Sequence, residues 1–252
     1  MTPTAPELSI VIPAYNEERR LPETLRRIRA YLDTRRISAE IIVVDDGSSD
    51  GTAALVERLR AEFSGLRLVL NDTNRGKGYS VRHGMLEARG DVLLFTDADL
   101  SSPIAEAAKL FAALEAGADV ALGSRWLRSE LQTERQPVYR QLFGRLFNLF
   151  LRVVLGLRFR DTQCGFKAFT RRAAQAIFPR QRIERWGFDA ELLFLAVRLG
   201  FQAAEVPVQW AHDERSKMSY FRDGMRMVTE VLRIRWYSLA GRYEQAAAPA
   251  ES

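Results

Sequence analysis

Short apolar runs alternate with amphipathic stretches through the first half of the chain. The stretch from Leu21 to Leu32 spaces its apolar residues as one face of a helix does, whereas the runs around it are rich in β-branched residues, as strands are. Runs such as IIVV and VLLF are apolar at consecutive positions, so these strands are expected to be covered on both faces. This alternation is typical of an α/β fold with a mostly parallel sheet and crossover helices. Strands are predicted at Leu8 to Ile12, Glu40 to Val44, Leu66 to Leu70, Asp91 to Thr96 and Val120 to Gly123.

The same pattern divides the chain into one main domain and short ends. We expect disordered residues 1–7, a single α/β domain over 8–220, a C-terminal helix over 221–243 and a disordered tail over 244–252. The 252 residues suffice to bury a sizeable core. In open sheets of this kind ligands collect at the carboxyl ends of the strands, so the polar turns after the strands are where chemistry is expected.

Arginine supplies most of the positive charge, and the formal net charge is +5. Such a balance favours anionic partners, and charge alone leaves nucleic acid, nucleotide phosphates and an acidic membrane surface open. The basic residues are scattered along helices without the interleaved aromatic side chains of a nucleic-acid surface, which disfavours nucleic acid.

The single cysteine, Cys164, excludes an internal disulfide and fits a reducing compartment. We expect it to be a small buried residue rather than a nucleophile. The first residues, MTPTAPE, lack the basic and apolar regions of a signal peptide, and no apolar run approaches the roughly 20 residues that span a bilayer. We therefore expect a cytoplasmic protein that would meet a membrane by lying on its cytoplasmic face.

Polar turns follow the first three predicted strands. Residues 13–18 (PAYNEE) and 45–52 (DDGSSDGT) follow the first two, and the adjacent carboxylates Asp45 and Asp46 are more than helix capping requires. One of this pair could hold ribose hydroxyls or a base while the other supports the loop. Residues 74–78 (NRGKG) follow the third strand, and glycine with lysine before a helix suits a phosphate, although the order does not match a P-loop.

The strongest local signal is Asp97-Ala98-Asp99, directly after the apolar run VLLFT. Residues two apart in an extended chain project to the same side, so both carboxylates could face one divalent cation. A site of few carboxylate oxygens suits Mg²⁺ or Mn²⁺ bridging a diphosphate, with water and phosphate oxygens completing the shell. An isolated D-x-D is more often a solvated Asx turn, but its place at a strand end beside two other polar turns favours the metal site.

Taken together and in this order, the motifs resemble glycosyltransferase family 2 from about Leu8 to Tyr220. Within that family the resemblance is to transferases acting on dolichyl or other polyprenyl phosphates, the β-glucosyl enzymes first and the mannosyl enzymes second. It implies a GT-A fold, a UDP-sugar or alternatively a GDP-sugar donor, a polyprenyl phosphate acceptor and inverting chemistry. The narrower resemblance is carried by Gly123 to Arg125 (GSR), Asp161 to Lys167 (DTQCGFK), Glu184 to Asp189 (ERWGFD) and His212 to Tyr220 (HDERSKMSY).

The resemblance also implies roles for single residues. Asp99 would hold the metal, and Asp97 would contact the metal or the ribose. Arg125 and Arg140 match positions that receive the acceptor phosphate. Ser101 stands where the mannosyl relatives often have Gln, so water would replace a third metal ligand. The donor nucleoside would be bound by Pro13, Tyr15, Glu17 and Asp45 or Asp46, and its diphosphate would be covered by a loop bearing Arg215 and Lys217. Apart from the resemblance, Arg75 and Lys77 of the 74–78 turn and Trp186 are further candidates for donor binding.

The acceptor decides whether the reaction needs a base. A sugar hydroxyl would need a carboxylate, for which Asp189 or Glu191 is the candidate. A phosphate monoester has a second pKa of about 6, so its dianion attacks without a base, and the protein must instead offset repulsion between phosphates. Arg125 and Arg140 are the candidates for that role. A soluble transferase acting on a glycan and a non-catalytic nucleotide-binding module are the remaining alternatives.

Three further side chains have two interpretations each. Trp186 could stack on the donor sugar or fill the core beneath Phe188. The histidines, His83 and His212, are expected to be structural rather than catalytic.

Residues 140–156 project as an amphipathic helix, within an interfacial helix expected at about 137–157. A basic arc opposite bulky apolar residues suits a helix in the headgroup region of a membrane, although packing on the sheet is the commoner fate. The Arg-rich stretch 222–240 could be a second surface element or the contact of a homodimer. The polar arc holds Arg140, Gln141, Gly144, Arg145, Asn148, Arg152 and Gly156, with only Leu151 and Leu155 intruding.

Overall fold

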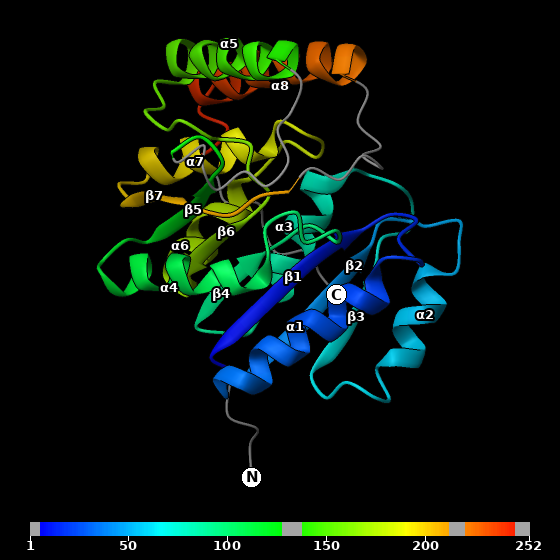
Figure 1. Ribbon diagram of the computed structural model, residues 1–252. Coiled ribbons are helices and arrows are strands. Elements are labelled where there is room, and N and C mark those ends of the chain that lie inside the picture. The colour runs from blue at the N-terminus through cyan, green and yellow to red at the C-terminus, as the bar shows by residue number, and fades with distance from the viewer. Residues whose placement is uncertain (1–5, 128–137, 212–219, 245–252) are drawn as a thin grey trace.

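The computed structural model describes residues 6–127, 138–211 and 220–244, with the backbone alone at 138–145 and 220–223. Seven strands form one sheet: β1 (Leu8–Ala14), β2 (Ala39–Asp45), β3 (Leu66–Leu70), β4 (Val92–Phe95), β5 (Val120–Ser124), β6 (Lys167–Thr170) and β7 (Ala203–Pro207). Their order across the sheet is β3-β2-β1-β4-β6-β5-β7 (Figure 1). Only β6 is antiparallel to its neighbours among these strands, so the expected mostly parallel sheet is confirmed.

Helices cover both faces of the sheet (Figure 1). They are α1 (Leu21–Arg35), α2 (Thr52–Leu59), α3 (Lys77–Glu87), α4 (Ala107–Glu115), α5 (Val138–Leu155), α6 (Arg171–Ile177), α7 (Phe188–Arg198) and α8 (Tyr220–Leu239), with short 3-10 turns η1 (Ile104–Glu106) and η3 (Phe178–Arg180). Helices α1, α2 and α4 share one apolar core, and α3, α6 and α7 share the other. Helices α5 and α8 pack on each other and close the second core.

The strand sequences explain why both faces are covered. In β2, Ile41 and Val43 face the core beneath α1, whereas Ile42 and Val44 face the core beneath α3. Alternate residues of a strand project to opposite faces, so an uninterrupted apolar run fills both cores at once. The expectation of strands buried on both sides is therefore confirmed.

All five strands predicted from the sequence are present, but β6 and β7 were not predicted. β6 begins with Lys167 and has only four residues. β7 reads AAEVP and is half-exposed throughout, so neither strand has the long β-branched run that identified the others. Both are added to the sheet by pairing with neighbours, and that pairing is tertiary information.

Helix α5 lies where the amphipathic pattern predicted it, but its packed face straddles one edge of the predicted polar arc. Leu151 and Leu155, which intruded on that arc, are buried at 0% and 6% exposure. The bulky residues on the opposite side, Leu146, Leu149 and Val153, are 54%, 56% and 76% exposed. The helix therefore packs through these two leucines together with Phe147, Phe150 and Val154, and turns the rest of its apolar side outward.

None of the helices in the described part of the chain combines the length and the apolar character that a bilayer crossing requires.

Candidate active site

The candidate site lies at the carboxyl edge of the sheet, where the chain reverses its direction of strand addition. β1 has β2 on one side and β4 on the other, so the loops after β1 and β4 separate at this point. In open α/β sheets such a switch point forms the ligand crevice. Because β6 is antiparallel, its first residue, Lys167, also lies at this edge, opposite Phe95 and Leu122 of its neighbours.

The turns after β1 and β2 interlock. The side chain of Asn16, whose φ is 55°, accepts a hydrogen bond from the Ser49 amide at 2.8 Å. The Glu17 amide donates to Thr52 Oγ1 at 2.9 Å. Tyr15 is 41% exposed at the same turn. The structure thus brings together the segments proposed for the nucleoside, with Pro13 half-buried at the end of β1.

The adjacent carboxylates Asp45 and Asp46 are both buried, and they support different loops. Asp45 accepts from the amide and the hydroxyl of Ser48 in its own turn. Asp46 accepts from the amides of Arg75 and Gly76 at 3.0 and 2.8 Å, and from Asn71 Nδ2 at 2.8 Å. Asp46 is therefore the residue that fastens the 74–78 turn to the edge of the sheet.

Asp97 and Asp99 follow β4 and lie close enough to repel each other. Asp97 forms an ion pair with Lys77 Nζ at 2.5 Å, which brings the glycine-lysine turn to the D-x-D motif. Asp99 accepts from the Ser101 amide at 2.9 Å, which is the Asx turn considered as the alternative. Burial first, and then the charge of Asp97, raises the pKa of Asp99 above its ordinary value.

This pair fits a divalent cation. Two neighbouring carboxylates, of which one is paired with a lysine, carry an excess of negative charge, and oxygen ligands suit Mg²⁺ or Mn²⁺. No third Asp, Glu, His or Cys joins them among the residues that the structure describes, so phosphate and water oxygens would complete the shell. Gly165 packs against the pair so closely that a Cβ there would collide with Asp97 Oδ2.

Trp186 lines the approach to Lys77. Its ring centroid is 5.9 Å from Lys77 Nζ, and its side chain is half-buried. Phe188, two residues later, is fully buried in the core. Of the two interpretations of Trp186, the structure supports a place at the site edge and not in the core beneath Phe188.

Arg125, at the end of β5, is aimed by Asp161. Its Nε and Nη2 donate to the two carboxylate oxygens at 2.7 and 2.8 Å, and its amide donates at 2.9 Å. Burial alone would raise the pKa of the Asp161 carboxyl, but the Arg125 guanidinium beside it lowers the pKa below its ordinary value. The sequence motif contained Asp161, but its partnership with Arg125 could not be read from spacing.

Asp189, at the start of α7, is buried and forms an ion pair with Lys167. Lys167 Nζ also donates to the Cys164 carbonyl at 2.6 Å. Burial raises the pKa of Asp189 despite this pairing. The candidate base of the sequence analysis is therefore already committed to a buried lysine, which the sequence did not indicate.

Hydrogen bonds from the C-terminal segment and its neighbours hold the loop that precedes α7. Glu191, the second candidate base, accepts from the Ile183 amide at 2.8 Å and from Tyr243 Oη at 2.6 Å. Burial raises the pKa of this fully buried carboxyl to about 7. Glu230 of α8 accepts from the Gly187 amide at 2.7 Å. Glu191 therefore supports the loop that carries Trp186.

The two minor expectations within the described residues are confirmed. Cys164 is 2% exposed in the core, and burial raises the pKa of its thiol to about 12. His83 Nδ1 is 2.8 Å from Asn71 Oδ1, and burial lowers its pKa, as for a structural histidine.

Four residues predicted from the sequence have no described side chain. Arg215, Lys217 and His212 lie outside the described residues. Arg140 lies in α5 where only the backbone is described.

The class of protein follows from this arrangement. The switch point of an open sheet carries the D-x-D motif, the 74–78 turn with its lysine and the 45–52 turn with its two buried aspartates. These features together are those of a glycosyltransferase of the GT-A type. The family model described as glycosyl transferase family 2 matches residues 9–178. The chain therefore belongs to glycosyltransferase family 2.

Curated relatives confirm the narrower resemblance. The dolichyl-phosphate β-glucosyltransferase of Dictyostelium discoideum is 36% identical over 93% of this chain and 75% of the relative. The enzymes of the same name from Drosophila melanogaster and Homo sapiens are 36% and 35% identical, over 96% and 95% of this chain and 78% of each relative.

Solved structures show the fold. Glucosyl-3-phosphoglycerate synthase of Mycobacterium tuberculosis, in complex with Mn²⁺, uridine diphosphate and glucosyl-3-phosphoglycerate, matches with a TM-score of 0.63 at 22% identity. The match covers 91% of this chain and 80% of that one. Mannosyl-3-phosphoglycerate synthase of Rubrobacter xylanophilus gives 0.62 at 22% identity, over 94% of this chain and 76% of that one. The expected GT-A fold is confirmed.

Proposed function

We propose that this protein transfers glucose from UDP-glucose, with inversion, to the phosphate of a polyprenyl or dolichyl lipid. The observation that carries the proposal is the meeting of Asp97, Asp99 and Lys77 at the switch point of a family 2 fold. Relatives named dolichyl-phosphate β-glucosyltransferase support the choice of sugar and acceptor. The runner-up is the GDP-mannose version of the same reaction.

Asp97 and Asp99 would hold Mg²⁺ or Mn²⁺. When bound, such a metal neutralises charge on the departing nucleoside diphosphate. Lys77 adds a positive charge beside Asp97. Burial alone would lower the pKa of this lysine, but the neighbouring carboxylates, Asp97 above all, keep it above the ordinary value. The turns at 13–18 and 45–52 would bind the nucleoside, with Asp46 fixing the 74–78 turn against them.

The structure supports an acceptor that needs no base. Asp189 is buried and paired with Lys167, so withdrawing a proton from a hydroxyl would first require breaking this pair. A phosphate monoester near pH 7 is already largely a dianion, because its second pKa is about 6. The remaining requirement is positive charge that offsets phosphate repulsion.

A cavity beside Arg125 offers that charge. It has a volume of 310 Å³ and is lined by Trp126, Asn148, Leu149, Arg152 and Arg160. Arg152 donates to the Phe159 carbonyl through Nε, and neither it nor Arg160 forms an ion pair with a described carboxylate. We assign this cavity to the acceptor headgroup, with Arg125 held next to it by Asp161.

The apolar surface near this cavity supports peripheral membrane contact. The outward residues of α5, Leu146, Leu149 and Val153, recur at helical spacing on one side. α8, which packs on α5, carries a second outward series in which Leu232 and Trp236 are 51% and 52% exposed. Contiguous exposed apolar residues mark interaction surfaces, and Arg152 supplies charge for anionic headgroups. We place the protein on the cytoplasmic face of the membrane.

The decisive experiment measures turnover by purified protein. UDP-glucose, GDP-mannose and other nucleotide sugars are offered with a short polyprenyl phosphate and Mg²⁺ or Mn²⁺. We expect transfer from UDP-glucose, loss on chelation and loss in Asp99→Ala. No transfer from any donor would overturn the proposal, and transfer from GDP-mannose alone would select the runner-up.

Acceptor binding is tested separately. Arg152→Gln and Arg160→Gln should raise the KM for the lipid phosphate about tenfold, with the KM for UDP-glucose unchanged. Arg58→Gln, a change of an exposed arginine on α2, is the matched control. Equal KM values for the lipid in all three variants would remove the cavity from the acceptor site.

Membrane contact is tested by vesicle flotation. Leu149→Ser and Val153→Ser should weaken binding to vesicles that contain anionic lipid. Leu86→Ser and Val197→Ser change residues that are 48% and 51% exposed on other helices, and they should bind as the unaltered protein does. Equal flotation of all four variants would contradict the assigned surface.

A further inference from the structure

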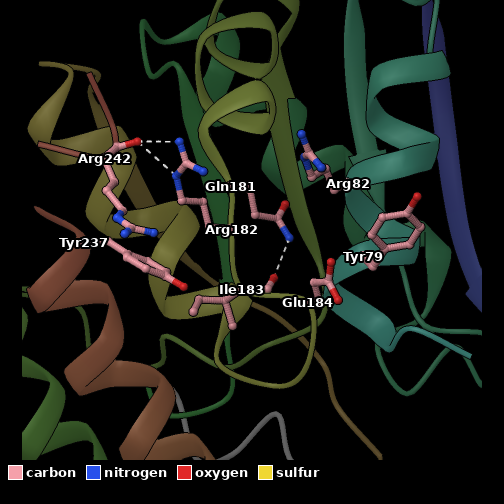
Figure 2. A pocket seen from close by; sticks show the side chains of 8 residues that line it. All are labelled: Tyr79, Arg82, Gln181, Arg182, Ile183, Glu184, Tyr237 and Arg242. Atoms are coloured by element: carbon pink, nitrogen blue, oxygen red, sulfur yellow. Dashed lines mark hydrogen bonds between the residues drawn. The ribbon is translucent and has the colours of Figure 1, made fainter. Parts of the chain in front are cut away.

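A second cavity lies behind the candidate active site. It has a volume of 290 Å³ and is bounded by α3, by the loop between η3 and α7, and by the end of α8 (Figure 2). Its lining residues are Tyr79, Arg82, Gln181, Arg182, Ile183, Glu184, Tyr237 and Arg242. This volume is just below the range for ligand pockets, about 300–1,000 Å³, and suits a small metabolite.

Positive charge around this cavity is only partly offset by nearby carboxylates. Among the described residues, none of Arg82, Arg182 and Arg242 forms an ion pair. Glu184, the one carboxylate in the lining, is paired with Arg75 outside it. Burial lowers the pKa of Arg82, and the charges of Glu184 and Glu191 only partly offset this removal of the guanidinium from water.

The three guanidiniums are held in place by other contacts. Arg82 Nε donates to the Phe178 carbonyl at 3.1 Å. Arg182 donates through Nε and Nη2 to the Arg242 carbonyl at 3.0 and 2.6 Å. Arg242 stacks over Trp236 with 4.7 Å between its Cζ and the ring centroid. These contacts fix the groups without neutralising them, so the cavity is preorganised for an anion.

Gln181 adds a second requirement for the ligand, which is a hydrogen-bond donor. It is 2% exposed, and its Nε2 donates to the carbonyls of Gly78 and Ile183 at 2.7 and 3.0 Å. Its Oε1 is buried and has no hydrogen-bond partner. Figure 2 shows this side chain between Arg82 and Arg182. A buried acceptor without a donor is costly, so a ligand with a hydroxyl would relieve it.

The cavity is separate from the D-x-D motif. At about 100° per residue, Tyr79 and Arg82 lie about 200° and 140° around α3 from Lys77, the residue that pairs with Asp97. Helix α3 therefore stands between the two sites. The loop of Glu184 borders both, because Glu184 lines the cavity while Trp186 lies near Lys77.

We propose that this cavity binds a small phosphate ester that carries a free hydroxyl. The arginines take the phosphate oxygens, and Gln181 Oε1 accepts from the hydroxyl. Guanidinium groups suit phosphate because their donors form paired, charge-assisted hydrogen bonds. The site does not depend on the proposed transfer reaction.

Calorimetric titration of the full chain in EDTA tests the site, since chelation keeps metal-dependent nucleotide binding out of the measurement. Glycerol 3-phosphate is the probe, propyl phosphate is a probe of similar size without hydroxyls, and glycerol carries no charge. We expect saturable binding of glycerol 3-phosphate, weaker binding of propyl phosphate and no heat from glycerol.

Arg82→Gln should weaken glycerol 3-phosphate binding by about tenfold or more, whereas Arg58→Gln on α2 should leave it unchanged. Arg242→Gln, at an exposed residue, gives a second test should Arg82→Gln fold poorly. Absence of saturable binding by the unaltered protein, or full affinity in both cavity variants, would overturn the proposal. Equal affinity for propyl phosphate would overturn the role of Gln181.

Discussion

The two halves of the candidate active site hold their carboxylates in different ways. After β2, Asp45 and Asp46 accept hydrogen bonds from backbone amides and neutral side chains. Around β5 and β6, the buried carboxylates of Asp161 and Asp189 are paired with an arginine and a lysine. Hydrogen bonds within and between turns therefore hold the carboxylates of the first half. Ion pairs between separate segments hold those of the second.

This difference sets what each half can tolerate. When a buried carboxylate loses one of several amide donors, its other hydrogen bonds remain. The free energy of unfolding then falls by about 1–3 kcal/mol. A buried ion pair that loses one partner leaves an uncompensated charge in the core, which costs about 3–5 kcal/mol. We therefore expect single substitutions to be more damaging in the second half than in the first.

The largest expected effect is on the Arg125–Asp161 pair. Asp161→Ala leaves the Arg125 guanidinium without its carboxylate and should lower the free energy of unfolding by about 3–5 kcal/mol. The urea midpoint measures this loss. Removing both charges, as Arg125→Met with Asp161→Leu, should restore much of the stability, and a double variant as unstable as Asp161→Ala would contradict the ion-pair explanation.

The next effect concerns pH. Folding raises the pKa of Glu191 from its ordinary value of 4.5 to about 7, so the native state holds a proton that the unfolded chain releases. This contribution to stability is present below about pH 4.5 and is lost as pH rises towards 7, by about 3 kcal/mol at most. Urea titrations of the unaltered protein and of Glu191→Gln at several pH values measure it. A difference between the two that did not change over this range would contradict the pKa.

A smaller loss of stability is expected from a substitution in the first half of the site. Asp46→Asn places an amide group opposite the donors of Arg75 and Gly76 and should cost about 1–3 kcal/mol. It should also raise the KM for the sugar nucleotide, because the turn that carries Lys77 loses its anchor. Asp72→Asn, at an exposed residue just before the same turn, is the control. If Asp46→Asn lowered the free energy of unfolding as much as Asp161→Ala does, the proposed difference between the halves would be wrong.

The smallest expected effect comes from a substitution at the point where the two halves meet. Gly165→Ala places a Cβ against Asp97 Oδ2 and 2.9 Å from Lys77 Nζ. We expect a fall in kcat of about tenfold, roughly 1.4 kcal/mol, with the fold intact. Gly224→Ala has open space around its Cβ and serves as the control. Unchanged turnover in Gly165→Ala would mean that the position of Asp97 is not critical.

The sequence predicted the parts of the site that depend on strand ends. Asp97 and Asp99 follow an apolar strand, and Asp45 and Asp46 follow another, so their meeting at one edge follows from parallel pairing alone. One of the adjacent carboxylates was expected to support its loop, which Asp45 does through Ser48, whereas the support that Asp46 gives to the 74–78 turn was not predicted.

The rest depended on contacts that spacing does not reveal. Arg125 meets Asp161, and Lys167 meets Asp189, only because β6 enters the sheet against the direction of its neighbours. That strand has four residues and begins with a charge, so its pattern is too short to identify. Helix periodicity placed α5 correctly but could not say which face packs, because packing is decided by what the rest of the fold leaves uncovered.

The reversed direction of β6 has one more consequence. The chain departs from the sheet after Ser124 and returns at Lys167 on the same rim. The described residues between these two points, α5 included, therefore belong to a segment that starts and finishes at the crevice. Its exposed residues, Leu149 and Arg152 of the proposed acceptor cavity among them, could change without shifting the register of any strand. Evolution could thus change the recipient of the sugar while leaving the frame that handles the donor untouched.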